Sequence, residues 1–179
     1  LNVIENVPAL IEAGVSSLKI EGRMKSLHYI ATIVSTYRKL IDAYCEDPDH
    51  FVHDEKYMKE IEKAANRLLT LGFYNQTPTA KDQLFNLRDE HPTQEFCIRV
   101  LNYNPISKLA MIEQRNYFKV GDQVEFFSPN QDNFTVVIDK IYNEDHELVE
   151  KANHPMEILF IEVDHSVSKD DLARKVRVE

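Results

Sequence analysis

The stretch that decides how the first half of the chain folds is Ser17-Leu18-Lys19-Ile20-Glu21-Gly22-Arg23-Met24-Lys25-Ser26. Side chains alternate between the two faces of a strand, so a strand over residues 15–21 places Leu18 and Ile20 on one apolar face. Lys19 and Glu21 then share the opposite face. The sequence predicts a strand that carries charged groups to its carboxyl end. In barrels of alternating strands and helices, that end is where sites are built.

Helical patterns lie on both sides of this strand. Residues 3–13 carry apolar side chains at helical spacing, and Gly14 stands where a glycine commonly ends a helix. Ser26 is expected to cap a second helix through its side-chain oxygen. The buried stripe predicted for that helix is Leu27, Ile30, Val34, Tyr37, Ile41 and Tyr44. One strand between two helices cannot form a sheet, so the chain is expected to be a fragment of a larger protein.

A third helix and a connector follow. Turn residues at 47–50 end the second helix, and the third is predicted over about 54–69, with acidic residues in its first turn that suit the helix dipole. Residues 75–93 contain two prolines and show no clear periodicity, which is typical of a connector. We therefore predict one domain over residues 1–80 and a second over residues 81–179.

The pattern changes to short strands from about Glu95 onward. Phe96, Ile98 and Val100 alternate with the residues between them, as in a half-buried strand. Further strands are predicted at 109–113, 123–127, 134–141, near 148 and at 158–161, with turn residues between them. Short strands at this spacing favour a small antiparallel barrel or a sandwich.

Charge and cysteine content limit the classes of function. Residues 1–80 hold 9 Lys and Arg against 11 Asp and Glu, and residues 81–179 hold 12 against 19. A surface that binds nucleic acid phosphates usually has a basic excess, so this balance disfavours autonomous RNA binding. The two cysteines form no disulfide framework, which favours a cytoplasmic location. No apolar run reaches the roughly 20 residues of a membrane span, so no membrane contact is expected.

The motif at 17–26 is similar to that of the U32 peptidase family, whose members are described as collagenase-like proteases. Further phrases that resemble this family are Tyr37-Arg38-Lys39, Thr70-Leu71-Gly72-Phe73-Tyr74, Ile112-Glu113-Gln114-Arg115-Asn116 and His154-Pro155. The resemblance implies that residues 1 to about 45 are the end of a TIM-like catalytic barrel. It also implies that the remainder includes the family's C-terminal β-barrel domain. The expected fold class is therefore α+β, a βα remnant followed by a small antiparallel β-barrel.

The resemblance implies two activities for the full-length protein. One is a peptidase, in which this chain is an accessory part that positions a peptide substrate or a partner and is inactive alone. The alternative is prephenate-dependent hydroxylation of tRNA or rRNA bases with an iron–sulfur cluster. The cluster's cysteines are expected outside this chain, because Cys45 and Cys97 lie 52 positions apart and match no cluster spacing. We therefore expect no cofactor here, and a structural or homo-oligomeric role is a third alternative.

The charged groups around the motif are the candidate site. Lys19 and Glu21 are the candidate catalytic residues, since a lysine can hold an anionic substrate and a glutamate can orient that lysine or exchange a proton. Arg23, Tyr29 and Arg38 are the candidate substrate-binding residues. The alternative is a structural ion pair that locks the end of the strand.

Two further groups of residues have competing interpretations. The histidines, among them His50 and His53 beside aspartates, are better explained as turn and cap residues than as metal ligands, so no metal site is predicted. The polar loop 113–116 precedes Tyr117 and Phe118. It is either a recognition loop with exposed aromatic rings or a hairpin with both rings tucked under the barrel.

Overall fold

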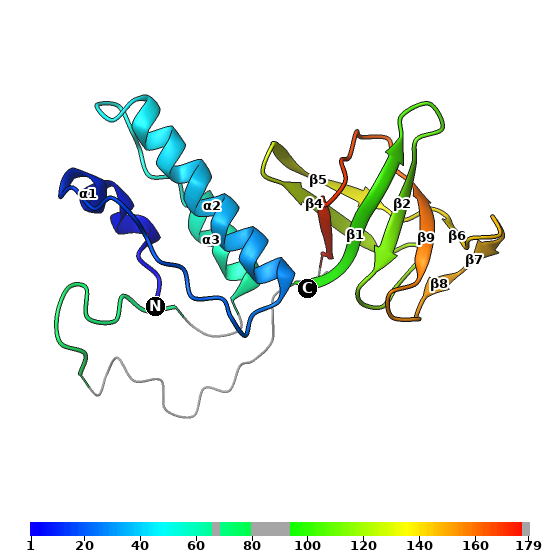
Figure 1. Cartoon of the computed structure of the whole chain (residues 1–179), viewed down its shortest axis with the longest axis horizontal. Helices are drawn as coiled ribbons and strands as arrows, with labels where there is room; N and C mark the ends of the chain where they lie inside the picture. The colour runs from blue at the N-terminus through cyan, green and yellow to red at the C-terminus, as the bar shows by residue number, and fades with distance from the viewer. Residues whose placement is uncertain (66–68, 80–93, 177–179) are drawn as a thin grey trace. The chain divides into compact units, whose positions relative to one another are not determined.

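The computed structural model describes residues 1–65, 69–79 and 94–176 (Figure 1). The chain divides into two compact units, Leu1–Thr93 and Gln94–Glu179. The boundary expected between residues 80 and 81 falls outside the described residues. Helices occupy the first unit and an antiparallel sheet occupies the second, so the chain has an α+β fold.

Within residues 1–65 and 69–79, the N-terminal unit contains a short 3-10 turn and three helices. These are η1 (Ile4–Asn6), α1 (Val7–Glu12), α2 (Leu27–Glu46) and α3 (Lys56–Ala64). The Oγ of Ser26 accepts a hydrogen bond from the backbone N–H of Tyr29 at 3.2 Å, so the predicted cap of α2 is confirmed. The Oδ1 of Asp54 accepts a hydrogen bond from the backbone N–H of Lys56 at 2.8 Å just before α3. The N-cap residue of α3 is Glu55, which makes no side-chain cap hydrogen bond, and the acidic residues expected in the first turn lie before the helix instead. Helix α3 ends at Ala64, earlier than predicted, and residues 66–68 lie outside the described residues.

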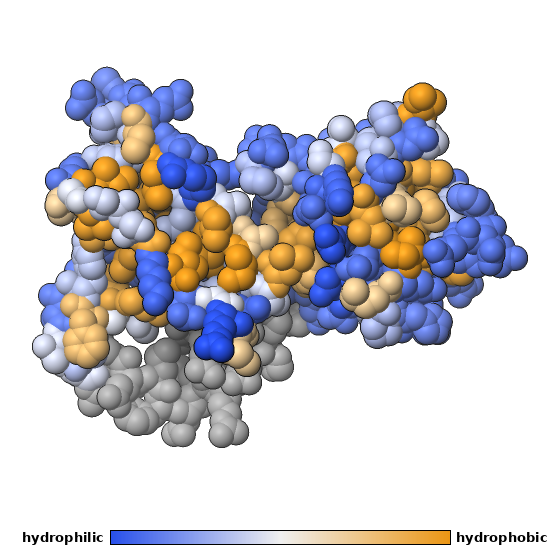
Figure 2. All heavy atoms as spheres, in the orientation of Figure 1, coloured by the Kyte–Doolittle hydropathy of each residue, from blue (hydrophilic) through white to orange (hydrophobic). Residues whose placement is uncertain are grey.

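The core of this unit lies between α2, α3 and the N-terminal segment formed by η1 and the start of α1. Its buried side chains are Ile4, Val7, Ile33, Leu40, Tyr57 and Ile61. The stripe predicted for α2 is wrong in part, because Leu27 and Val34 are each 46% exposed. The helix instead turns the neighbouring face, with Ile33 and Leu40, toward α3. Figure 2 shows the resulting apolar surface along α1 and α2.

The predicted strand over residues 15–21 is also wrong. This segment has no strand assignment, and no described segment forms a ladder with it. A strand requires a hydrogen-bonded neighbour, which sequence alternation alone does not supply. Leu18 and Ile20 are half-buried against the helical core, while Lys19 and Glu21 are exposed, so the predicted alternation between faces is kept.

Over residues 94–176, the C-terminal unit contains ten strands. They are β1 (Glu95–Asn104), β2 (Leu109–Gln114), β3 (Phe118–Lys119), β4 (Gln123–Ser128), β5 (Gln131–Val137), β6 (Ile141–Tyr142), β7 (Leu148–Val149), β8 (Lys151–Ala152), β9 (Ile158–Glu162) and β10 (Leu172–Lys175). Eight of them form one sheet in the order β5-β4-β10-β1-β2-β9-β6-β7, and β3 pairs with β8. Each of these pairs is antiparallel, as predicted.

The predicted closed barrel is not detected among the described strands. Strands β5 and β7 stand at the two ends of the sheet order, and no described ladder joins them. The sheet nevertheless buries a dense core that includes Ile112, Phe118, Phe126, Leu159 and Ile161, all fully buried.

Strand β10 was missed by the sequence analysis, although it joins β4 to β1. It contains Arg174, which is fully buried and donates from Nε to the Oε2 of Glu125 at 2.8 Å. The guanidinium carbon of Arg174 also lies 4.5 Å from the ring centroid of Phe127. A buried charge of this kind is stable only when it is paired, and the pairing is invisible in a linear pattern.

Candidate functional site

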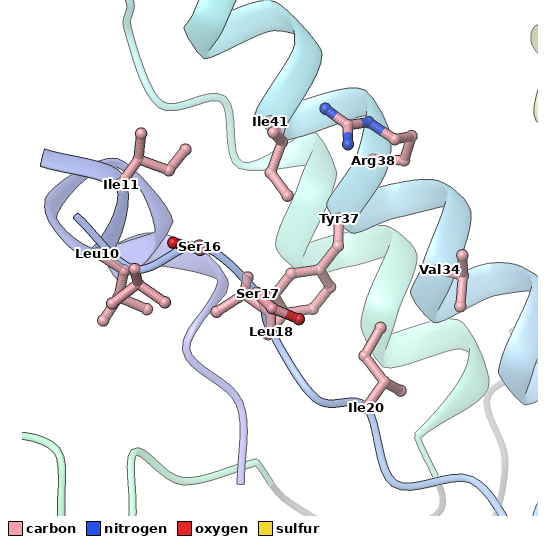
Figure 3. A pocket seen from close by; sticks show the side chains of 11 residues that line it. Leu10, Ile11, Ser16, Ser17, Leu18, Ile20, Val34, Tyr37, Arg38 and Ile41 are labelled. Atoms are coloured by element: carbon pink, nitrogen blue, oxygen red, sulfur yellow. The ribbon is translucent and has the colours of Figure 1, made fainter.

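The charged motif lies on an extended segment that passes between α1 and α2 (Figure 3). Two pockets flank this segment, and Leu18, Ile20 and Tyr37 line both of them. The first, which we call the Lys19 pocket, has a volume of about 310 Å³ and includes Lys19, Glu21 and Tyr29 in its wall. The second, the Arg38 pocket, has a volume of about 340 Å³. Its walls come from α1, α2 and the segment between them.

The structure therefore brings three of the five candidate residues together. Lys19, Glu21 and Tyr29 share the Lys19 pocket, whereas Arg38 lines the neighbouring one. Arg23 is exposed and lines neither pocket.

The alternative of a structural ion pair receives no support from the described residues. Within the described part of the chain, Glu21 forms an ion pair with neither Lys19 nor Arg23. The Oε1 of Glu21 instead accepts a hydrogen bond from the backbone N–H of Arg23 at 3.2 Å. This contact stabilises the turn before α2 and leaves the ammonium group of Lys19 exposed and open to an anion.

Tyr29 and Arg38 each contact a charged side chain four residues away along the chain. The Nζ of Lys25 lies 5.3 Å from the ring centroid of Tyr29, a cation–π contact. Arg38 donates to the carboxylate of Asp42 one helical turn later, and both side chains are largely exposed. A substrate anion would have to compete with Asp42 for Arg38.

Tyr37 is the pocket residue that the sequence analysis did not select. Its hydroxyl donates to the Oδ1 of Asn2 at 2.8 Å and accepts from the backbone N–H of Val3 at 3.2 Å. Burial raises the pKa of Tyr37, so the hydroxyl stays neutral. Its helical spacing indicated only a packing role. The hydrogen bonds to the N-terminal turn depend on the tertiary structure.

In the polar loop after β2, each of the two interpretations, an exposed recognition loop or a tucked hairpin, holds for one aromatic ring. Phe118 is fully buried, as the tucked hairpin predicts, but Tyr117 is 43% exposed. The Nζ of Lys175 lies 5.4 Å from the ring centroid of Tyr117. Arg115 pairs with the largely buried carboxylate of Glu113 at 3.0 Å, so its charge is already neutralised locally.

The cysteines do not fit an iron–sulfur cluster. Burial raises the pKa of the Cys97 thiol to about 12, so it stays protonated, whereas the cluster ligand is a thiolate. Cys45 is exposed on α2. Within residues 1–65, 69–79 and 94–176, no three His, Cys, Asp or Glu side chains gather so that they could hold a metal ion.

None of the helices in the described ranges is both long and apolar enough to cross a membrane.

Two family models match the chain. The model described as peptidase family U32 matches residues 1–84, and the model of the peptidase family U32 C-terminal domain matches residues 92–174. The C-terminal domain of a Geobacillus thermoleovorans protein described as a U32 peptidase is a similar solved structure. It is 42% identical, with a TM-score of 0.44, and the match covers 45% of this chain and 91% of that one.

The similar curated proteins carry names from RNA modification and from proteolysis. Over 175 residues the chain is 44% identical to tRNA hydroxylation protein P1 of Bacillus subtilis, which covers 98% of this chain and 42% of the relative. It is 32% identical to tRNA hydroxylation protein P of Escherichia coli, covering 76% of this chain and 30% of the relative. It is also 31% identical to an uncharacterized protease of Methanocaldococcus jannaschii, covering 69% of this chain and 31% of the relative.

The chain thus spans less than half the length of these curated relatives. The names of the relatives fit the RNA-hydroxylation alternative better than the expected collagenase-like peptidase.

Proposed function

Because the chain belongs to peptidase family U32, we propose that it is part of a protein that hydroxylates tRNA or rRNA bases, and not of a peptidase. The observation that carries this proposal is the 44% identity to a tRNA hydroxylation protein, which extends through both units. The family description and one relative named as a protease are what favour a peptidase. An RNA substrate would place the protein in the cytoplasm.

The Lys19 pocket is the part of this chain that we assign to the reaction. Lys19 offers an exposed cation, which suits a phosphate of RNA or a carboxylate of a co-reactant such as prephenate. Glu21 and Tyr29 lie in the same wall and supply a proton acceptor and a hydroxyl. Arg38, in the neighbouring pocket, is proposed to contact a more distant part of the substrate.

This pocket is proposed to be completed by other parts of the protein. The segment over residues 15–22 is extended but has no strand partner among the described residues. Beside it, Leu27 and Val34 expose apolar surface on α2. An unpaired extended segment and a bare helix face are what the neighbouring strands and helices of a TIM-like barrel would cover. The C-terminal unit would then be an accessory domain that positions a partner or a part of the substrate.

The test uses the full-length protein in its own cells. Deletion of the gene should remove hydroxylated uridine or cytidine from tRNA or rRNA, measured by mass spectrometry of digested RNA. Re-expression of the wild type should restore it. Lys19→Ala should lower the recovered level by about 10- to 100-fold, since a lost charge-assisted contact costs about 1.5–3 kcal/mol, and Lys19→Arg should recover part of it.

The matched control is Lys59→Ala. Lys59 pairs with Glu55 on the exposed surface of α3, so its loss removes the same charge without touching the pocket. Unchanged RNA in the deletion strain would end the proposed function. Full restoration by Lys19→Ala would remove only the assignment of the site. Peptide cleavage by the purified full-length protein that is lost in a folded Glu21→Gln variant would favour the peptidase instead.

A further inference from the structure

The C-terminal unit leaves one edge of its main sheet open. Strand β5 pairs with β4 on one side, and no described strand pairs with its other side (Figure 1). An open edge presents unpaired backbone N–H and C=O groups that can pair with another chain. It is therefore a candidate interaction surface that the proposed RNA reaction does not use.

The direction of the backbone groups on β5 follows from the hydrogen bonds at its end. Ile138 donates its N–H to the carbonyl of Asp122 at 2.9 Å and accepts at its carbonyl from Gly121 at 2.8 Å, so residue 138 faces β4. Alternate residues of a strand face the same neighbour, so Thr135 and Val137 direct their N–H and C=O groups away from β4.

A second contact supports this direction. The carbonyl of Gln123, the partner of Val137 in the ladder, accepts from the N–H of Val176 and so faces β10 instead of β5. The pair of residues 123 and 137 is therefore a non-hydrogen-bonded pair. In the described part of the chain, the outward backbone groups of Thr135 and Val137 have no partner.

The open edge forms one wall of a groove of about 410 Å³. The residues that line this groove, which we call the β5 groove, are Ser107, Lys108, Thr135, Val136, Val137, Asp139, Glu162, Asp164 and His165. The ring of His165 stacks on the ring of Phe134 in β5, with centroids 4.6 Å apart, and Phe134 stacks on buried Phe126 at 5.3 Å. These stacks hold the opposite wall against β5, so the groove is preformed.

The sequence of this edge lacks the usual protection against strand addition. Asp132 is charged and lies near the start of β5, but residues 133–137, which include the part that lines the groove, carry neither a charged side chain nor a proline, the two devices that commonly block an open edge. Thr135, Val136 and Val137 are β-branched and favour the extended conformation. Val137 is also 59% exposed, although most large apolar side chains of this unit are buried.

The charge of the groove indicates the chemistry of its occupant. Asp139, Glu162 and Asp164 line the groove, where Lys108 pairs with Asp164 at 2.7 Å and Lys140 pairs with Glu162 at 3.2 Å, so the three carboxylates outnumber these two lysines. Hydrogen bonding to Lys108 lowers the pKa of Asp164, so that carboxylate stays ionised. Residues 94–179 as a whole hold 10 Lys and Arg against 16 Asp and Glu. This excess repels RNA phosphates and a second acidic copy of the chain, but it attracts a basic segment.

We propose that the β5 groove binds an extended, basic segment of a partner protein, which adds to the sheet as a strand beside β5. The outward N–H and C=O groups of Thr135 and Val137 would bind the backbone of the segment, and the acidic wall would select lysine or arginine side chains.

The test measures binding of a fluorescent seven-residue peptide of alternating lysine and valine, as long as β5, to the full chain. Thr135→Pro removes the outward N–H but spares the ladder with β4, and Thr135→Val keeps the N–H as the matched control. We expect Thr135→Pro to weaken binding by about tenfold, the effect of losing one or two backbone hydrogen bonds, and Thr135→Val to leave it unchanged. Asp164→Asn should weaken it by a smaller factor, and a glutamate–valine peptide should not bind.

A change in the peptide instead of the protein keeps the test decisive if Thr135→Pro disturbs the fold. Methylation of alternate backbone nitrogens of the peptide removes its donors and should abolish binding to the unchanged protein. Failure of the lysine peptide to bind, or equal binding to a folded Thr135→Pro variant, would overturn the proposal. So would competition by single-stranded polyuridylate, or a wild-type dimer that dissociates in the proline variant, since these outcomes identify RNA or a second copy as the occupant.

Discussion

The two units of this chain bury apolar surface in different ways. In the C-terminal unit each central strand has a neighbour on both sides, and the core side chains are almost completely buried. The N-terminal unit forms a smaller core surrounded by half-buried side chains, with Leu27 and Val34 exposed on α2. The strands of the sheet therefore cover one another's apolar side chains, whereas the helical unit keeps apolar surface that suits further contacts.

The largest expected difference between the units is in amide hydrogen exchange. Amides of β1 and β2 should exchange at least about three orders of magnitude more slowly than those of residues 16–20, since opening a core strand costs about 5 kcal/mol or more. Backbone N–H groups of the 16–20 segment have no described hydrogen-bond partner. Mass spectrometry of peptic peptides measures both in one experiment. Equal protection in a monomer would break the comparison.

A smaller effect is expected from deletion of one core side chain. Phe126 is fully buried against Phe134, so Phe126→Ala should lower the free energy of unfolding of the C-terminal unit by about 3–5 kcal/mol. Val34→Ala, on the exposed face of α2, should change stability by no more than about 0.5 kcal/mol. Urea unfolding, followed by amide hydrogen exchange of peptides from β1 and α2, measures the stability of the two units separately. A large loss for Val34→Ala would mean that this face is already covered.

The change that is smallest per step of the experiment is a pH dependence, for which each unit supplies one cysteine. Burial raises the pKa of the Cys97 thiol from 9.0 to about 12, so the folded state keeps a proton that the unfolded state releases. The free energy of unfolding should therefore fall as pH rises from about 9 to about 12, by at most about 1.4 kcal/mol per pH unit. Below about pH 9 this contribution is fully present.

Urea titrations across this pH range provide the measurement. Cys97→Ala should flatten the slope, whereas Cys45→Ala, which removes an exposed thiol of the helical unit, should leave it unchanged. Identical slopes in the wild type and in Cys97→Ala would show that the thiol is not shielded from water.

Local signals in the sequence were sufficient for several elements. The cap at Ser26, helix α2 and strands β1, β2, β4 and β9 lie close to where periodicity and turn residues predict them. These elements are long or have clear alternation, so neighbouring residues carry the information. Strand β10 has no such alternation, because Arg174 occupies a buried position that only its pairing with Glu125 makes stable.

The candidate site was predictable to a similar extent. The motif identified Lys19, Glu21 and Tyr29, which share one pocket. It did not indicate that Arg23 lies outside both pockets, or that Arg38 is engaged by Asp42. Tyr37 was missed because its hydrogen bonds reach Asn2 and Val3, more than thirty positions away.

The family, the order of helical and strand segments, and the charges that the motif displays were all readable from the sequence, because these depend on residue identity and on spacing along the chain. The tertiary structure alone decided which face of α2 is buried, that residues 15–21 have no described strand partner, and which edge of the sheet stays open. These outcomes depend on hydrogen bonds and packing between segments distant in sequence, which periodicity cannot encode.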